Sequence, residues 1–179
     1  MSPPMALRYS RHPEIMTLDT LVAELPLRGI AVASPLSVRH MYRTDSERLV
    51  DLWFACYHDT LAAETTREEE LADWTAAFNG EYGCVLTAAS LVVESDQALV
   101  AAIQTVLDPP WPHTPSGPFI IELLVHPRCR RHGVGTALIQ QACQAAYYLN
   151  HTTIALRVDR NNIGAHSLYR TLGFTDWQP

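Results

Sequence analysis

The chain has 179 residues, 47% of them hydrophobic, and a formal net charge of −6. A chain of this length can bury about 70% of its unfolded surface in one globular domain. The acidic balance argues against nucleic-acid binding, which needs clustered positive charge, and no run approaches the roughly 20 apolar residues that cross a bilayer.

The first 36 residues are predicted to be an N-terminal extension that contains one short helix. Four apolar residues share one face at helical spacing: Leu18, Leu21, Val22 and Leu25. Pro26 would end this helix, because proline removes a backbone donor and clashes with the preceding turn. Residues 37–179 are then the main predicted domain.

A strand and two helices are expected at the start of this domain. Residues 37–42 suit a strand, after which Thr44 and Glu47 form the pattern of a capping box. The helix that follows carries apolar residues at i, i+3, i+4 and i+7, namely Leu49, Leu52, Trp53 and Cys56. A second helix begins near Thr66 with Glu69 in the same capping pattern and ends at 79–80. Its inward residues are predicted to be Leu71, Trp74 and Phe78.

Short apolar runs then replace the helical pattern. Residues 84–88, 91–94 and 99–107 are predicted strands of an antiparallel meander. Residues 108–118 hold five of the twelve prolines, so this segment is expected to be a stiff loop.

The last third of the chain predicts a strand, a helix and a parallel strand. The strands cover 119–125 and 153–158, and the helix between them covers 134–150. A final helix is expected over 164–172, where apolar residues again recur at helical spacing.

The turn before residue 134 has the features of an anion site. Gly133 and Gly135 let the backbone approach a phosphate closely, and Arg130 and Arg131 supply counter-charge. The first turn of a helix also offers unpaired N–H groups and the positive end of the helix dipole. We therefore expect a phosphate-bearing ligand here, with an ordinary surface turn as the alternative.

Two motifs in this region resemble those of a known superfamily. The first is Arg130-Arg131-His132-Gly133-Val134-Gly135, and the second is made of Asn162, Ala165, Leu168, Tyr169, Gly173 and Phe174. In this order and spacing the sequence resembles the GNAT superfamily of acyl-CoA-dependent N-acetyltransferases over about residues 37–176. The resemblance implies an α/β (α+β) fold with a mixed, twisted central sheet and helices on both faces. The two parallel strands should separate to form a wedge for the cofactor.

The resemblance also implies that acetyl-CoA is the co-substrate. The amides of residues 131–136 would cradle its diphosphate, and residues 123–125 would pair with the pantetheine arm, with the Val125 N–H polarising the thioester carbonyl. Asn162 would bind pantetheine amides, or simply cap its helix. The residues expected to bind the cofactor are Leu123, Leu124, Val125, Arg130, Arg131, His132, Gly133, Val134, Gly135, Thr136, Asn162 and Tyr169.

Two residues are candidates for the chemistry. Glu122 is the one polar residue of its strand, so it is either the base that deprotonates an amine or the partner of an arginine such as Arg157. By resemblance Tyr169 protonates the leaving thiolate, while its place on an apolar stripe also suits a core tyrosine.

The predicted function is direct transfer of an acetyl group from acetyl-CoA to a primary amine, most simply of a small molecule. Relatives that modify protein N-termini carry an acidic residue five positions before the asparagine, where this chain has Arg157. The acidic charge suits a cationic acceptor, and because all thirteen basic residues are arginine the chain offers no lysine amine of its own. The alternative is a non-catalytic CoA-binding sensor or assembly module.

Further expectations concern setting and partners. The four cysteines show no C-x-x-C spacing and no apolar leader opens the chain, which favours a cytoplasmic protein. We expect no metal, nucleic-acid or membrane partner, and a homodimer is possible. Few residues follow Gly173, so the sheet is completed by residues 1–36 or by a partner chain, or it keeps an open edge.

Overall fold

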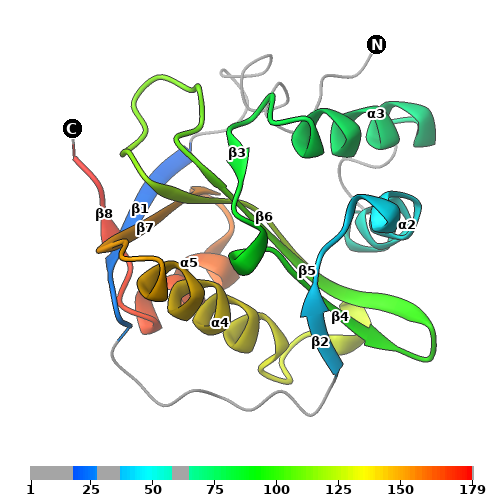
Figure 1. Ribbon diagram of the computed structural model, residues 1–179. Coiled ribbons are helices and arrows are strands. Elements are labelled where there is room, and N and C mark those ends of the chain that lie inside the picture. The colour runs from blue at the N-terminus through cyan, green and yellow to red at the C-terminus, as the bar shows by residue number, and fades with distance from the viewer. Residues whose placement is uncertain (1–17, 28–36, 58–64, 179) are drawn as a thin grey trace.

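The computed structural model describes residues 18–27, 37–57 and 65–178. Eight strands form one sheet in the order β2-β4-β5-β6-β7-β1-β8, and β3 pairs with β5 outside this path (Figure 1). The strands are β1 (Leu18–Glu24), β2 (Ser37–His40), β3 (Cys84–Val85), β4 (Leu91–Ser95), β5 (Ala98–Leu107), β6 (Pro118–Val125), β7 (Thr153–Asp159) and β8 (Thr175–Asp176).

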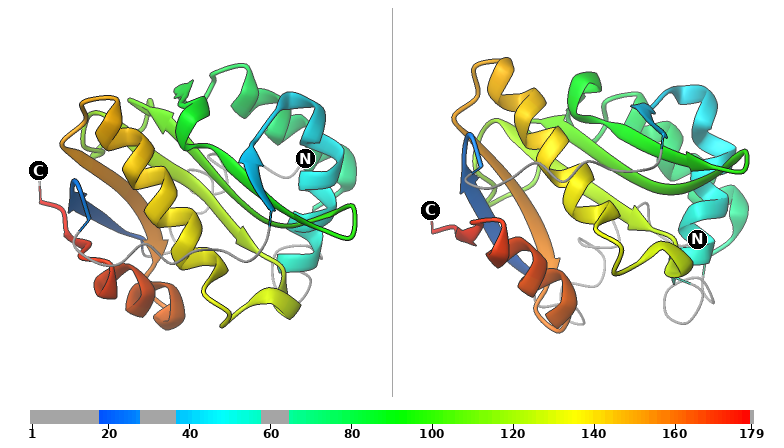
Figure 2. Two further views of the ribbon diagram at one scale, coloured as in Figure 1. Left: turned by 60° about the horizontal axis from the view of Figure 1, so that its bottom comes forward. Right: turned by 90° about the horizontal axis from the view of Figure 1, so that it is seen from below.

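Helices cover both faces of the sheet (Figures 1 and 2). They are α2 (Ser46–Tyr57), α3 (Arg67–Phe78), α4 (Val134–Tyr148) and α5 (Ile163–Thr171), with short 3₁₀ turns η1 (Arg43–Asp45), η3 (Thr87–Ala89) and η4 (Pro127–Cys129). The cluster around α4 and α5 includes Ile103 and Ile120, whereas the cluster under α2 includes Ala102 and Leu124. Because side chains alternate along a strand, these are opposite faces of one sheet. The predicted mixed sheet with helices on both faces is confirmed.

The two helices on the α2–α3 face begin differently from each other. Thr66 and Glu69 form the predicted capping box of α3, with the Thr66 hydroxyl accepting from the Glu69 N–H at 3.2 Å. The start of α2 differs from the predicted capping box of Thr44 and Glu47. The Tyr42 N–H instead donates to the carboxylate of Asp45. A 3₁₀ turn over Arg43–Asp45 therefore leads into α2.

The predicted N-terminal helix is wrong, because its residues form strand β1. β1 pairs antiparallel with β7 over its whole length, from Leu18↔Asp159 to Glu24↔Thr153, and with β8 on its other side. Leu21 and Ala23 alternate into the core at 0% and 2% exposure. Pairing on both edges outweighs the helical spacing of the apolar residues. Residues of the N-terminal segment thus complete the sheet, and the domain boundary predicted at residue 37 stays a prediction.

The two parallel strands separate soon after they meet. β6 and β7 pair only at Phe119↔Ala155 and Ile120↔Leu156, and in Figure 2 the strands run apart toward their ends. β6 shifts register against β5 between Gln104 and Thr105, so Ile121 is the extra residue of a bulge, which bends a strand. From Ile121 to Val125 the β7-facing side of β6 therefore has no strand partner among the described residues, and we call this the unpaired edge of β6.

None of the helices in the described ranges combines the length and apolarity that would be needed to cross a membrane.

Candidate active site

The backbone of the unpaired edge of β6 alternates in direction. The His126 N–H donates to the Val100 carbonyl of β5 at 2.9 Å. Because the direction of the backbone groups repeats every second residue along a strand, Leu124 and Glu122 also direct their N–H and C=O groups toward β5. Leu123 and Val125 direct theirs the other way, toward β7. Within the predicted trio 123–125, these two residues are the ones whose peptide groups face the unpaired edge.

The start of α4 is an uncapped helix N-terminus. Gly133 occupies the N-cap at φ +78°, a left-handed conformation that glycine adopts without strain, and it offers no side chain to the helix. The first helical bond runs from the Ala137 N–H to the Gly133 carbonyl at 2.9 Å. In the described part of the chain, the N–H groups of 134–136 meet no acceptor. These orphan donors, with the helix dipole behind them, suit an anion.

Gly135 brings three elements together. A Cβ atom built on this residue would lie 3.4 Å from Val125 Cγ2 of β6 and 3.8 Å from Leu168 Cδ2 of α5. Both are ordinary contact distances, so the protein itself would accommodate a methyl group here. The uncapped helix start, the unpaired edge of β6 and helix α5 are therefore immediate neighbours.

The basic residues of the turn have different surroundings. Arg130 donates from Nε to the Val125 carbonyl at 3.0 Å and from Nη2 to the Cys56 carbonyl at 3.1 Å, so it ties the turn to β6 and α2. His132 donates from Nδ1 to the Arg130 carbonyl at 2.7 Å, because a carbonyl oxygen can only accept. Arg131 is exposed at φ +66°. The positive charge of Arg131 is thus presented to solvent beside the helix start.

Glu122 is buried at 7% exposure on the α2–α3 face of β6. Its Oε1 atom accepts from the Tyr57 hydroxyl at 3.4 Å and from the Leu123 N–H at 3.2 Å. Burial, followed by the charge of Glu122, raises the pKa of the Cys56 thiol to about 11. Arg157 donates instead to the carbonyls of Pro112 and His113 at 2.7 and 3.1 Å.

Tyr169 lies on α5 at 7% exposure, with its ring 5.8 Å from that of Phe174. Its pKa is raised far above the ordinary value, first by burial and then by the charge of Glu122. The negative charge of Glu122 on β6 thus adds to the effect of burial on the pKa of Tyr169. Asn162 is the N-cap of α5, and its side-chain oxygen accepts from the Ala165 N–H at 3.1 Å. It therefore caps the helix, which is one of the two roles considered for Asn162; the other, binding of pantetheine amides, stays a prediction.

Three buried polar residues near this region were missed by the sequence prediction. Glu70 and Asp73 of α3 are 0% and 1% exposed, and Gln104 of β5 is 0% exposed. The predicted inward residues Leu71 and Phe78 are only partly buried and pack on the α2 cluster. The spacing of 70, 73, 74 and 77 is the signal that identifies the stripe, because these positions share a helix face with Trp74.

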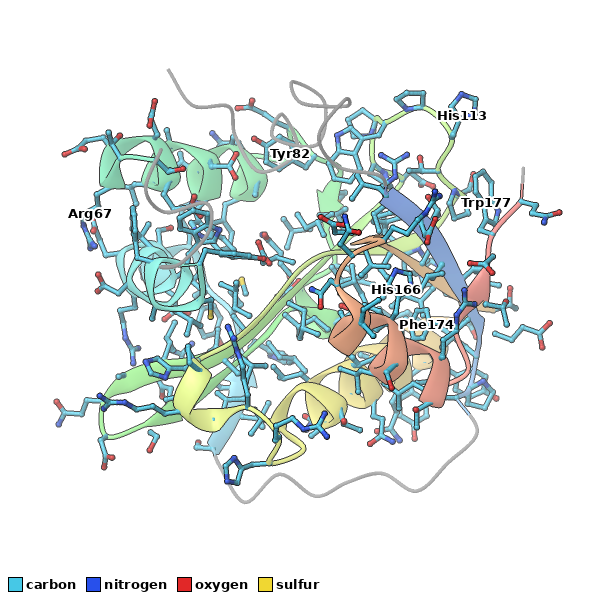
Figure 3. All side chains as sticks on the ribbon, turned by 180° about the vertical axis from the view of Figure 1, so that it is seen from behind. Arg67, Tyr82, His113, His166, Phe174 and Trp177 are labelled. Atoms are coloured by element: carbon cyan, nitrogen blue, oxygen red, sulfur yellow. The ribbon has the colours of Figure 1, made fainter. Side chains whose placement is uncertain are left out.

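A separate hollow of about 330 Å³ lies at the β1–β8 edge. Its lining comes from β1, the 108–118 loop and the end of the chain: Leu18, Asp19, Thr20, His113, Asp176, Trp177 and Gln178. Figure 3 shows His113 and Trp177 at this edge. Its carboxylates Asp19 and Asp176 already bond Arg160 and Arg170, and it contains none of the predicted site residues.

Comparisons with known proteins identify a family. The sequence profile described as "Acetyltransferase (GNAT) family" matches residues 46–174. The comparison with curated proteins finds no match.

Solved structures with a similar fold share little sequence with the chain. An aminoglycoside antibiotic 6′-N-acetyltransferase from Acinetobacter haemolyticus is 20% identical with a TM-score of 0.62, covering 80% of this chain and 94% of its own. A GCN5-related N-acetyltransferase from Sphaerobacter thermophilus is 17% identical with a TM-score of 0.67, covering 96% of this chain and 53% of its own. A third, AAC(6′)-Iy in complex with the bisubstrate analogue CoA-S-monomethyl-acetylneamine, is 17% identical with a TM-score of 0.62, covering 82% of this chain and 95% of its own.

Proposed function

The chain belongs to the GNAT acetyltransferase family, and on this basis we propose that it transfers an acetyl group from acetyl-CoA to a primary amine of a small molecule. The observation that carries the proposal is the uncapped start of α4 beside the unpaired edge of β6. The first offers donors to a diphosphate, and the second offers peptide groups to the amides of the pantetheine arm.

The proposed contacts follow the predicted residues. The amides of 131–136 hold the diphosphate, and Arg131 supplies counter-charge from its exposed position. Leu123 and Val125 pair with pantetheine, and the Val125 N–H stabilises the negative charge that develops on the thioester oxygen. Arg130 binds the Val125 carbonyl on this same edge, so it holds the end of β6 next to the start of α4.

The proposed reaction is direct attack of the amine nitrogen on the thioester carbonyl carbon. The new C–N bond forms and the C–S bond breaks, which releases the CoA thiolate. Glu122 accepts the proton that the amine loses, and the Tyr169 hydroxyl gives a proton to the sulfur. Burial keeps Tyr169 protonated, which is the form that a proton donor requires.

A small-molecule acceptor is favoured by two considerations. The position that is acidic in relatives acting on protein N-termini is Arg157, whose guanidinium binds loop carbonyls. Neighbours of the same fold include enzymes named for aminoglycosides, which are small-molecule amines.

Two measurements on the purified protein test the proposal. Acetyl-CoA should raise the melting temperature in a concentration-dependent way, since a ligand that binds only the folded state stabilises it. A panel of primary amines should then release free thiol in proportion to acetylated product. If acetyl-CoA neither binds nor stabilises, the proposal fails. Binding without turnover of any amine would favour the sensor or assembly module instead.

The role of Tyr169 has its own test. Tyr169→Phe removes only the hydroxyl, so we expect kcat to fall by roughly 10²- to 10³-fold while the Kd for acetyl-CoA changes less than about threefold. Single-turnover kinetics and calorimetric titration measure the two quantities. An unchanged kcat would assign Tyr169 to the core alone.

A further inference from the structure

The carboxylate of Glu122 is bonded to the edge that the proposed function gives to the cofactor. Leu123 directs its N–H toward the unpaired edge of β6, and this N–H donates to Oε1 of Glu122 at 3.2 Å. A pantetheine arm that pairs with Leu123 needs the same N–H, and a backbone N–H supplies only one donor. Binding of the arm therefore requires the carboxylate of Glu122 to leave the edge.

Gln104 of β5 is the neighbour of Glu122 on the side away from this edge. The two residues are direct partners in the antiparallel pairing of β5 and β6, so their side chains leave one face of the sheet with Cβ atoms about 5 Å apart. This is the face that α2 covers, because Ala102 and Leu124, two positions further along each strand, pack in the α2 cluster. A rotation of the Glu122 side chain can thus bring its carboxylate to the amide of Gln104.

The amide of Gln104 is buried without a partner. Its side chain is 0% exposed, and neither Oε1 nor Nε2 makes a hydrogen bond within the part of the chain that the structure describes. Buried polar groups nearly always have a partner, because one that lacks it has lost water and gained nothing in return. The Nε2 group is a donor and a carboxylate is an acceptor, so Gln104 is suited to be a second partner for Glu122.

The surroundings of Glu122 make such an exchange inexpensive. The Tyr57 hydroxyl donates to Oε1 at 3.4 Å, a long bond that restrains the carboxylate only weakly. Positive charge is present on the same face, because Arg157 lies two positions from Ala155, which packs with Ala77 of α3. The exchange itself replaces one charge-assisted hydrogen bond by another, from a backbone N–H to an amide N–H.

From these observations we infer that the pantetheine arm turns Glu122 from the Leu123 N–H to the Nε2 group of Gln104. Gln104 then positions the base in the complex with acetyl-CoA, although it touches neither the cofactor nor the amine. The edge of β6 becomes available to the cofactor, while the carboxylate stays beside it to receive the proton of the amine. This inference rests on the proposed function and adds a positioning residue to the same site.

The first test measures the affinity of two ligands by calorimetric titration. They are acetyl-CoA and 3′-phospho-ADP, which carries the diphosphate of CoA but no pantetheine arm. Gln104→Leu should raise the Kd for acetyl-CoA about 3- to 10-fold, because the displaced carboxylate finds no amide, and change the Kd for 3′-phospho-ADP less than about twofold. Gln144→Leu, at an exposed position of α4, makes the same chemical change and should alter neither.

The second test asks whether Gln104 acts through Glu122. Glu122→Ala removes the carboxylate that turns, so adding Gln104→Leu to this variant should change the Kd for acetyl-CoA less than about twofold. In the background of the intact Glu122, Gln104→Leu should also lower kcat about tenfold, since the base is present but poorly positioned. An equal rise in Kd with and without Glu122 would mean that Gln104 acts independently, through a bound water or through the shape of the site.

The third test concerns the free protein. Because the amide has no partner in this state, Gln104→Leu should leave the free energy of unfolding equal or raise it, as measured by urea denaturation without ligand. A loss of stability would show that Gln104 already has a partner in the free protein, which contradicts the exchange.

The outcomes separate this inference from the function on which it rests. A wild-type protein that does not bind acetyl-CoA would overturn the proposed function. Wild-type binding that Gln104→Leu does not weaken, or weakens equally in the absence of Glu122, would overturn the exchange and leave the proposed acetyltransferase intact.

Discussion

At the scale of single residues, Gly133 and Gly135, which are separated by one residue, have different physical reasons to be glycine. Gly133 has φ +78°, a left-handed conformation that a residue with a Cβ atom adopts only at a cost. Gly135 is helical, and a Cβ atom on it would make only ordinary contacts with Val125 and Leu168. The fold therefore explains Gly133. It gives no such reason for Gly135, where we propose that the missing side chain leaves room for the diphosphate of CoA.

This difference gives a paired prediction. Gly135→Ala should leave the free energy of unfolding unchanged or raise it by up to about 1 kcal/mol, because alanine favours helix over glycine. The same variant should weaken CoA binding at least tenfold. Gly133→Ala, as the control, should lose about 1–2 kcal/mol of stability. Urea denaturation and calorimetric titration measure both quantities, and normal CoA affinity in Gly135→Ala would contradict the cradle at the start of α4.

Sequence patterns singled out some of the candidate residues and overlooked other buried polar ones, for physical reasons. Gly133 and Glu122 could be recognised from the sequence, because a glycine at a helix start and a carboxylate within an apolar strand differ from the residues expected at such positions. The burial of Asp73 and Gln104 was not predicted, because a polar residue in a helix or strand is normally expected to face solvent until its neighbours are known. Arg130 was predicted as counter-charge, and only the fold shows its bonds to two carbonyls.

At the scale of elements, an ion cluster around the buried Asp45 of η1 joins β2, α2 and β4. Asp45 is 4% exposed and accepts from both terminal nitrogens of Arg39, at 2.8 and 2.7 Å, and from the Tyr42 N–H at 2.9 Å. Arg39 and Arg48 both reach Glu94 of β4, at 2.8 and 2.7 Å. Burial alone would raise the pKa of Asp45, but the bonds from Arg39 and Tyr42 outweigh it and hold this pKa below its usual value.

The lowered pKa predicts how stability depends on pH. The contribution of ionised Asp45 is complete above the ordinary aspartate pKa of about 3.9, and it is lost as pH falls through the lower pKa of the folded state. Asp45→Asn should therefore cost about 1–3 kcal/mol at pH 7, and the gap from the wild type should close below about pH 4. Urea denaturation at several pH values checks this. A gap that is constant with pH would show that the charge of Asp45 contributes nothing.

Elements with several agreeing signals were predicted well. The box of Thr66 and Glu69 fixes the start of α3, and the apolar runs before and after residue 134 give β6, α4 and β7. The error at β1 arose because seven residues are compatible with both a helical and an alternating pattern. Only pairing with β7, far along the chain, decides between them, and no local sequence window contains that information.

At the scale of the whole molecule, β1 is a structural part of the sheet. Leu21 is 0% exposed and belongs to the same core cluster as Leu138 of α4 and Phe174. Without β1, the outer edge of β7 would be unpaired beside the proposed site.

Truncation of one core side chain tests the contribution of β1. Leu21→Ala should lower the free energy of unfolding by about 2–5 kcal/mol, because it leaves a cavity among buried neighbours. Leu149→Ala, at a position that is 46% exposed, makes the same chemical change and should cost less than about 0.5 kcal/mol. Denaturant titration of both variants measures this difference. Equal losses would mean that β1 is only loosely attached.

The location of β1 also affects how the protein is made. Thr20 of β1 and Arg157 of β7 are hydrogen-bonded although they are 137 positions apart. On a ribosome that adds about 5–20 residues per second, β1 emerges first and waits roughly 7–27 seconds for its partner strand. During synthesis its apolar side has nowhere to pack, so a nascent chain is at greatest risk of misassembly, or in need of a chaperone, until the last helix has emerged.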